Sequence, residues 1–329
     1  MRSAEQLILL VGGNPLPNYL VARLLEPRVV FLVHSGETLE PARRLREVLN
    51  QRIPGAVVTL HGLADAAEAG EVHRIVRQLP ASAHLDYTGG TKVMAAHGRL
   101  AFASRGGEPA RASYLFEAPG DRACLRFDDG RSEALLRREL GLDLGVLMGL
   151  HGLRRQPGRQ TAVSADEARA EAERFLAEPE AEAGQAGPGH WLEVWLADLL
   201  RQHLPDAEVS QGVHLERTGR NLELDVLVVR GHRLHLISCT TAKDLTKAKL
   251  KLFEASHRAR QLGGDLSRAA LACRVDGSDR QGRRIDQLRA DVQDVWGGPR
   301  EIEVFGLDDL REWHQTGTPS TSLLRWLDH

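Results

Sequence analysis

The sequence predicts an α/β protein built of two domains. Its 329 residues correspond to about two domains at roughly 150 residues each. The first part alternates short apolar runs with amphipathic helical patterns, whereas the last part begins with a helix followed by three strands. With 42% hydrophobic and 27% charged residues, the composition is that of a globular protein with enough apolar side chains to form real cores.

The first domain is expected at residues 1–132. Its strands are short continuous apolar runs, which are typical of strands buried on both faces of a sheet, and they lie at 7–11, 29–33, 56–60, 84–87 and 112–116. Helical patterns separate them, among them 39–51 and 67–79, the second rich in Glu early and in Arg late, as the helix dipole favours. Repeated strand and helix predicts a parallel sheet covered on both faces.

A connector is expected at residues 133–189. Residues 133–153 have a helical pattern, and the stretch that follows is rich in Ala, Glu, Arg, Gln, Gly and Pro. Its Ala- and Glu-rich part, 166–182, is interpreted as a solvated helix, and 184–189 as a flexible joint. The sequence therefore predicts a polar linker between the two domains.

The second domain is expected at residues 190–329. A helix at 191–200 precedes strands at 208–216, 222–229 and 234–239, the last two joined by a tight turn at 230–233. The later elements alternate: a helix at 245–262, a strand at 269–275, a helix at 283–295, a strand at 301–305 and a short helix at 308–314. This order predicts an α/β domain with a mixed sheet.

Composition and pattern exclude several classes of protein. No run of about 18 apolar residues occurs, and the first apolar stretch is too short for a signal peptide, so we expect a cytoplasmic protein. The three cysteines, Cys124, Cys239 and Cys273, are odd in number and widely spaced, which argues against a disulfide framework and a structural zinc site. The formal net charge of -2 gives no global basic field, so nucleic acid would be contacted through a local patch.

Three polar segments follow strands of the first domain, at 12–18, 34–38 and 87–92. The carboxyl ends of parallel strands are where open α/β sheets bind ligands. In the last segment, two glycines permit close backbone approach, and Thr88, Thr91 and Lys92 could meet a phosphate beside the N-terminus of the next helix. Neither G-x-x-x-x-G-K-[ST] nor G-x-G-x-x-G occurs, which disfavours an ATPase and a dehydrogenase. Taken singly, each segment is better explained as a turn, but three at one sheet edge favour a site.

The segments 11–19 (VGGNPLPNY) and 87–94 (YTGGTKVM) resemble the ligand motifs of CARF domains, in the branch where a CARF domain precedes a nuclease domain in type III CRISPR antiviral effectors. The resemblance implies a Rossmann-like domain in a homodimer that binds a cyclic oligoadenylate, with cyclic tetra-adenylate as the expected activator. A cyclic ligand with repeated phosphates suits a two-fold axis. By position, the resemblance implies that the pocket is lined by Gly13, Asn14, Pro15, Ser35, Thr38, Thr88, Gly89, Gly90, Thr91 and Lys92.

The second domain carries acidic residues suited to a metal-dependent nuclease. Such enzymes use carboxylates to hold Mg²⁺ or Mn²⁺ and a Lys to steady the water or the phosphate. Glu193 lies on the first helix, and Glu223 and Asp225 lie two apart on one strand, so they share a face. Alternation alone would make these two an ordinary exposed sheet face. The order of helix, hairpin and Lys-rich helix, however, resembles the PD-(D/E)xK restriction-endonuclease-like fold, whose substrate would be DNA or RNA.

The match departs from the family at the next strand. Where Glu-x-Lys is expected, Ser238 occupies the Glu position and Thr240 the Lys position, and neither side chain can do the original work. In one interpretation, Glu254 and Lys251 or Lys247 on the following helix replace the lost groups. The catalytic candidates are then Glu193, Asp225, Ser238, Thr240, Lys251 and Glu254, and the metal-ligand candidates are Asp225, Glu223 and Glu254.

A second interpretation makes the domain a degenerate nuclease that binds nucleic acid or a partner. Residues 243–260 hold six Lys or Arg against two acids, a basic surface that suits phosphates in either case. A third makes Lys247, Lys251 and Glu254 a solvated, salt-bridged helix face. DNA versus RNA, and slow cleavage of the cyclic ligand by Thr91 and Lys92, stay open.

Other conspicuous residues are assigned structural roles. His151 and His190 lack metal-ligand spacing and are interpreted as surface or packing residues. Cys239 has no His nearby in sequence and is expected to be a small buried residue. Trp191 and Trp195, four apart on one helix, are expected in the core rather than on a base-stacking platform.

Overall fold

The computed structural model describes residues 4–116, 123–135, 140–157, 163–178, 189–217, 219–242, 244–275, 283–296 and 302–328. The chain forms two compact units, Met1–Leu153 and Arg154–His329. None of the helices within these ranges is long and apolar enough to cross a membrane.

Unit 1 contains a seven-stranded sheet with the order β3-β2-β1-β4-β5-β6-β7. Neighbours from β3 to β5 run parallel, whereas β6 and β7 join antiparallel at the edge. The five strands predicted from the sequence, β1 to β5, pair parallel as expected. The prediction missed β6 and β7, because these short edge strands carry no continuous apolar run. The strands are β1 Gln6–Leu10, β2 Val29–His34, β3 Val57–Gly62, β4 His84–Asp86, β5 Ala112–Phe116, β6 Cys124–Phe127 and β7 Ser132–Ala134.

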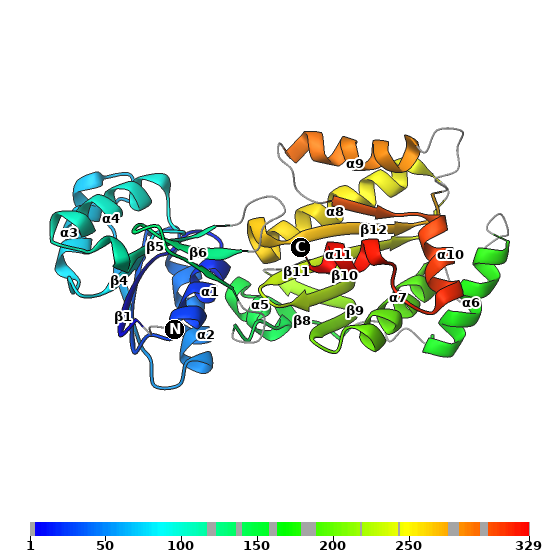
Figure 1. Ribbon diagram of the computed structural model, residues 1–329, viewed down its shortest axis with the longest axis horizontal. Helices are drawn as coiled ribbons and strands as arrows, with labels where there is room; N and C mark the ends of the chain where they lie inside the picture. Colours follow the sequence, from blue (N-terminus) through cyan, green and yellow to red (C-terminus); the bar gives the residue numbers. More distant parts are fainter. Residues whose placement is uncertain are drawn as a thin grey trace. The chain divides into compact units, whose positions relative to one another are not determined.

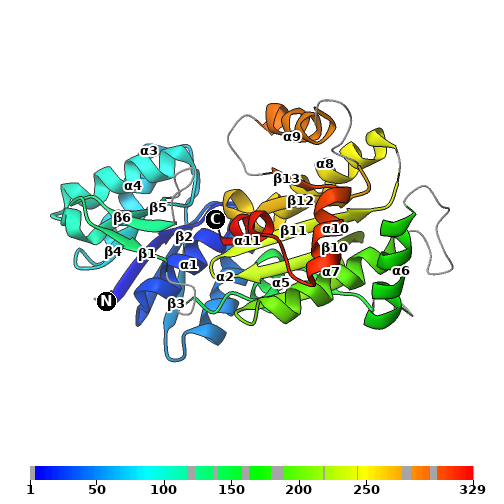
Figure 2. The same cartoon turned by 45° about the vertical axis from the view of Figure 1, so that its right-hand side comes forward.

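Helices cover both faces of this sheet, as predicted (Figures 1 and 2). The helices α1 Leu16–Leu25 and α2 Leu39–Arg52 lie on one face, and α3 Ala69–Gln78 and α4 Lys92–Ser104 lie on the other. One core cluster joins apolar side chains of β1 and β4 to those of α3 and α4. A single turn of 3₁₀ helix, η1 Pro109–Arg111, precedes β5.

The helix predicted over 133–153 is shorter in the structure. β7 occupies its start, and α5 Leu144–His151 forms its end. Asp143 caps α5, because its Oδ1 accepts a hydrogen bond from the Val146 amide at 2.7 Å. Residues 136–139 lie outside the described residues.

Unit 2 contains a six-stranded sheet with the order β13-β12-β11-β10-β9-β8. β8 to β11 pair antiparallel, and β11 to β13 pair parallel. The mixed sheet predicted for this domain is confirmed. Its strands are β8 Arg154–Arg155, β9 Ala207–Arg217, β10 Arg220–Arg230, β11 Arg233–Thr240, β12 Arg268–Cys273 and β13 Ile302–Phe305.

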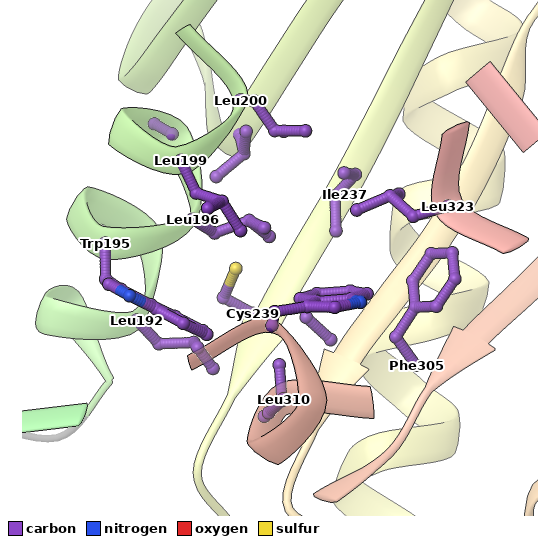
Figure 3. Close-up of a cluster of buried hydrophobic side chains, with 14 of the residues drawn as sticks. Leu192, Trp195, Leu196, Leu199, Leu200, Ile237, Cys239, Phe305, Leu310 and Leu323 are labelled. Atoms are coloured by element: carbon purple, nitrogen blue, oxygen red, sulfur yellow. The ribbon is translucent and has the colours of Figure 1, made fainter. Parts of the chain in front are cut away.

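Two hydrophobic clusters hold helices on opposite faces of the unit 2 sheet. The first joins α6 Ala165–Ala177, α7 His190–His203, α10 Leu307–Thr316 and α11 Thr321–Asp328 to β10 to β13. Figure 3 shows side chains of α7, β11, β13, α10 and α11 meeting in it. The second joins α8 Leu245–Gly263 and α9 Arg283–Trp296 to the other face, and the turn η2 Gly264–Leu266 follows α8. Trp191, Trp195 and Cys239 belong to the first cluster, which confirms their predicted core positions.

The helix α6 is not a solvated linker helix as predicted. Ala168, Ala172 and Leu176 are buried in the first cluster, and the ring of Phe175 lies 5.1 Å from that of Trp191. Ser164 and Glu167 form a capping box at its start. Its alanines offer too little apolar area for a periodicity argument to detect the buried stripe. The joint predicted at 184–189 lies, except for Gly189, outside the described residues.

The burial of α6 predicts a difference between two matched substitutions. Ala172→Asp places an unpaired charge where the side chain is 0% exposed, and we expect it to lower the free energy of unfolding of unit 2 by about 3 kcal/mol or more. Ala170→Asp, on the exposed side of the same helix, should change it by less than about 0.5 kcal/mol. Urea unfolding followed by tryptophan fluorescence measures both, and equal effects would show that α6 does not belong to the core.

Candidate functional site

The polar segments of unit 1 meet at the point where the strand order reverses. β1 and β4 are neighbours, and in such sheets the crevice beyond their carboxyl ends is the usual ligand site. A Cβ atom on Gly12 would lie 3.1 Å from the amide nitrogen of Gly90, so the loops after β1 and β4 touch. The amide of Val11 donates to the Val33 carbonyl at 2.8 Å, which brings the end of β2 to the same edge. The structure thus joins the three predicted segments.

Glycine is required at the centre of the loop after β4. A Cβ atom on Gly89 would lie 2.2 Å from the Leu10 carbonyl oxygen, and Gly90 has φ +80°, a conformation that L side chains rarely adopt. The buried Asn18 amide fastens the same place, because its Nδ2 donates to the Leu10 carbonyl at 3.0 Å. Sequence reasoning missed this role of Asn18, although a polar residue in an apolar helical run was a signal.

Thr88 and Thr91 build the loop. The Thr91 hydroxyl caps α4 by accepting from the Met94 amide at 3.1 Å, and the Thr88 hydroxyl accepts from the Leu115 amide at 2.6 Å. Lys92 is the first residue of α4 and its side chain is exposed. An ammonium group at a helix N-terminus is a suitable contact for a phosphate.

The other predicted ligand residues form two tight turns. In one, the Ser35 amide donates to the Thr38 hydroxyl at 2.9 Å, and the Thr38 amide donates to the Ser35 hydroxyl at 3.2 Å. In the other, the Asn14 side chain accepts from the Leu16 amide at 3.0 Å, Pro15 is buried, and Gly13 is exposed. These contacts fix the backbone before any ligand arrives.

A buried network of polar side chains holds the loop after β4 in place through hydrogen bonds. The Asp86 carboxylate accepts from the Thr88 amide at 3.1 Å and from the Ser113 hydroxyl at 3.0 Å, and the same hydroxyl lies 2.7 Å from His84 Nε2. Burial raises the pKa of Asp86 to about 6 and lowers the pKa of His84 to about 4. Near pH 7, Asp86 is therefore mostly ionised and can hold the Thr88 amide, while His84 is neutral.

In unit 2, the structure places Asp225 at the centre of the predicted site. Asp225 is buried, and its Oδ2 accepts from the Ser238 hydroxyl at 2.7 Å and from the Cys239 amide at 2.8 Å. The ammonium of Lys251 on α8 lies 3.8 Å from the same oxygen. Ser238, at the position where the resemblance implies a glutamate, thus holds the aspartate, and a lysine from the next helix supplies a positive charge beside it.

Glu193 brings a second buried carboxylate to this place from α7. Burial raises the pKa of Glu193 to about 8, and repulsion by the carboxylates of Asp225 and Glu223 adds to the rise, while Lys251 opposes it. Its Oε1 lies 3.6 Å from Nδ1 of His190, so this histidine borders the site, which the sequence had not indicated.

The remaining predicted residues are more peripheral. Glu254 on α8 forms an ion pair with Arg258, and Arg258 also donates to the Glu223 carbonyl. Lys247 is exposed, and the Thr240 hydroxyl accepts from the Ala242 amide at 3.2 Å. The Glu223 carboxylate is half exposed and its Oε1 lies 3.8 Å from Nε2 of His214. Sequence reasoning missed His214, because only strand register places it opposite Glu223.

The donor set fits a divalent cation held partly by water. Within the described parts of the chain, no three His, Cys, Asp or Glu side chains come close enough together to hold a metal ion. Asp225 and Glu193 are nevertheless two buried carboxyl groups, and the charge of Asp225 helps to raise the pKa of Glu193, so a cation bound beside them would favour the ionised form of Glu193. Mg²⁺ commonly uses one or two carboxylates and keeps several waters.

Comparison with solved structures shows that this two-part fold has precedents. Can2 from Sulfobacillus thermosulfidooxidans, in complex with cyclic tetra-adenylate, has a TM-score of 0.67 and 16% identity over 98% of each chain. Protein VC1899 from Vibrio cholerae has a TM-score of 0.64 and 15% identity over 94% of this chain and 96% of its own. A type III CRISPR defence DNA nuclease activated by cyclic oligoadenylate has a TM-score of 0.60 and 22% identity over 83% of this chain and 46% of its own.

No protein-family model and no curated protein matches the chain. The likenesses to solved structures therefore carry the comparison, and at these identities they show a shared fold. The predicted α/β fold class is confirmed, and the resemblance to CARF-domain nuclease effectors holds at the level of the fold.

The close approach at Gly89 predicts an unequal effect of two glycine substitutions. Gly89→Ala forces the added methyl group onto the Leu10 carbonyl, so we expect unit 1 to lose about 1–3 kcal/mol of stability. Gly13→Ala meets nothing within 4 Å and should leave the melting temperature unchanged. Calorimetric unfolding of the two variants checks this, and a Gly89→Ala protein as stable as Gly13→Ala would contradict the described loop.

The raised pKa of Glu193 predicts a pH dependence of stability without divalent ions. The carboxyl keeps its proton up to about pH 8 in the folded protein but ionises near pH 4.5 in the unfolded protein. The free energy of unfolding therefore falls as the pH rises between these two values. We expect unit 2 to lose roughly 1 kcal/mol per pH unit there. In Glu193→Gln this contribution is absent. Urea unfolding at pH 5, 6.5 and 8 compares the proteins, and parallel pH profiles would argue against the effect.

Proposed function

We propose that the chain is a cyclic-oligoadenylate-activated, metal-dependent nuclease of type III CRISPR antiviral defence. The observation that supports this most directly is the grouping of Asp225, Glu193 and Lys251. In metal-dependent phosphodiester hydrolysis, carboxylates hold the ion, and an ammonium group can stabilise negative charge at the phosphate. These three groups come together although β11, the strand that would carry Glu-x-Lys in a PD-(D/E)xK nuclease, has Ser238 and Thr240 at those positions.

The architecture of unit 1 supports the activator. Its loops after β1, β2 and β4 meet at the switch point of the sheet, with Lys92 exposed at a helix N-terminus. Can2, which has the same fold, was solved with cyclic tetra-adenylate. We propose that two copies of the chain bind such a ring across a two-fold axis, so that repeated phosphates meet the same loop twice.

The residues of unit 2 have distinct roles in this proposal. Asp225 and Glu193, with Glu223 at the rim, would hold Mg²⁺ or Mn²⁺, which when bound supplies charge stabilisation and an activated water. Ser238 and the Cys239 amide keep the Asp225 carboxylate in one orientation. Lys251 is placed to contact a phosphate oxygen and to stabilise the negative charge that develops as water adds to phosphorus and the bond to the leaving oxygen breaks.

Activation requires that the ligand prefers one arrangement of the dimer. We propose that binding closes the paired sensory units and brings the nuclease units into a competent pairing. Small-angle scattering with and without cyclic tetra-adenylate tests this coupling. Identical scattering profiles together with identical nuclease rates would contradict it.

A second candidate function is a sensor whose nuclease unit is inactive and acts by binding or recruitment. Two observations favour it: Ser238 and Thr240 stand at the positions of the family's Glu and Lys, and the described residues contain no metal-binding group of three ligands. In this case the basic α8 would contact nucleic acid or a partner without cutting.

Substitution of Asp225 separates the two candidates. The purified protein is incubated with Mn²⁺ and a mixture of supercoiled plasmid, single-stranded DNA and single-stranded RNA, with and without cyclic tetra-adenylate or cyclic hexa-adenylate. We expect cleavage with one ligand, and a loss of at least about a hundredfold in Asp225→Asn, since charge stabilisation at the reacting phosphate is removed. Asp308→Asn, at an exposed position of α10, is the matched control and should cut normally.

The other outcomes are equally informative. Absence of cleavage despite ligand binding would favour the inactive sensor. Cleavage that Asp225→Asn retains would contradict the assignment of the site. A loss in Lys251→Ala but not in Lys247→Ala would identify the lysine that replaces the family's strand residue.

A further inference from the structure

The face of the sheet that carries Asp225 continues outward over β10 and β9. Alternation places Asn221, Glu223 and Asp225 on one face of β10. In the antiparallel register His214 lies opposite Glu223, and Glu216 lies opposite Asn221, so both β9 residues share that face. β8 extends it further, because Arg154 pairs with Glu216. These residues form a continuous polar surface that extends from Asp225 over β10 and β9 to Arg154 on β8, and we call this surface the polar floor.

A cavity of about 440 Å³ opens on this floor, and it is lined by Gln156, Pro157, His214, Leu215 and Asn221. It begins beside Glu223, since His214 Nε2 lies 3.8 Å from the Glu223 carboxylate. At about 3.3 Å per residue, Asn221 lies roughly 13 Å along the strand from Asp225, a span that a few nucleotides of a strand can cover. The volume of the cavity is within the range of small-ligand pockets, about 300–1,000 Å³.

The groups around the cavity suit a nucleotide. Asn221 is exposed and half-buried His214 borders it, and amide and imidazole side chains form hydrogen bonds with base edges. Gln156 is fixed in place because its Nε2 donates to Glu216 at 2.5 Å and its backbone amide donates to the His214 carbonyl at 2.9 Å. Arg154 on the same floor is exposed and carries the charge that a phosphate requires.

We propose that this cavity is a nucleotide subsite, in which the substrate strand places a nucleotide that lies a short way along the strand from the scissile phosphate, and Asn221 determines which base is accepted. The inference rests on the proposed nuclease function and deepens it. His214 is a substrate-contacting residue in this scheme, because it lies between the subsite and the carboxylates. The nuclease thereby acquires a sequence preference at one position on one side of the cut.

The first experiment reads the preference directly. Full-length protein cleaves randomised single-stranded DNA and RNA with Mn²⁺ and cyclic tetra-adenylate, and the ends are sequenced. Wild type should favour one base at a fixed distance from the cut, and Asn221→Ala should flatten that preference. His214→Ala and Asn221→Ala should each lower kcat/KM by about fivefold to a hundredfold, the range for losing one good base contact. His203→Ala, which removes a histidine at the C-terminus of α7, and Gln315→Ala, at an exposed position of α10, are the matched controls.

The second experiment does not need catalysis. Fluorescence anisotropy of labelled oligonucleotides, with activator but without divalent metal, measures binding by the same variants. A weaker affinity in His214→Ala and Asn221→Ala, with unchanged affinity for cyclic tetra-adenylate and unchanged melting temperature, supports the subsite. Unchanged oligonucleotide affinity and cleavage pattern, or no oligonucleotide binding by wild type, overturns it. If wild type binds but does not cut, the nuclease proposal fails while the binding data still decide on the subsite.

Discussion

The buried carboxylate of Asp225 is the constraint on which the candidate nuclease site depends. A buried charge is costly unless hydrogen bonds and an opposite charge compensate it. Here the Ser238 hydroxyl, the Cys239 amide and the Lys251 ammonium provide that compensation from one strand and one helix. These contacts hold the aspartate in place, and they also hold its three partners in place. The pKa of the second carboxyl group, Glu193, is raised to about 8, chiefly by burial and then by the charges of Asp225 and Glu223.

In unit 1 the main constraint is the close approach of three loops, which follow β1, β2 and β4 and meet at one edge of the sheet. Close backbone contact at Gly12, Gly89 and Gly90 does this, since side chains at these positions would push the loops apart. The hydroxyl groups of Ser35, Thr38, Thr88 and Thr91 are already engaged by backbone amides. If this edge binds the proposed ligand, the loops are already held in shape before binding, and little ordering opposes the affinity.

Much of the fold was readable from the sequence because long apolar runs and helical periodicity carry most of it. Most strands and helices lie close to their predicted ranges, whereas the helix predicted at 133–153 is only partly present and α11 was not predicted. What failed were elements with weak patterns: β6 and β7 are short, and α6 uses alanines for its buried stripe. In the site, Glu193, Asp225 and Lys251 were named from motif order and helical spacing. His190, His214 and Asn18 were not, because their relevance depends on strand register or tertiary packing, which one sequence does not display.

The hydrogen bond between Ser238 and Asp225 also limits how such a site can change over generations. The resemblance proposed for this unit would place a glutamate at position 238, and a glutamate there would set a second carboxylate beside Asp225, where the serine now donates a proton. Two carboxylates at these positions would repel each other unless a cation lay between them, whereas Ser238 holds Asp225 without a cation. A glutamate at position 238 would therefore make the stability of this buried region depend on a bound divalent cation, a dependence that the serine hydroxyl avoids.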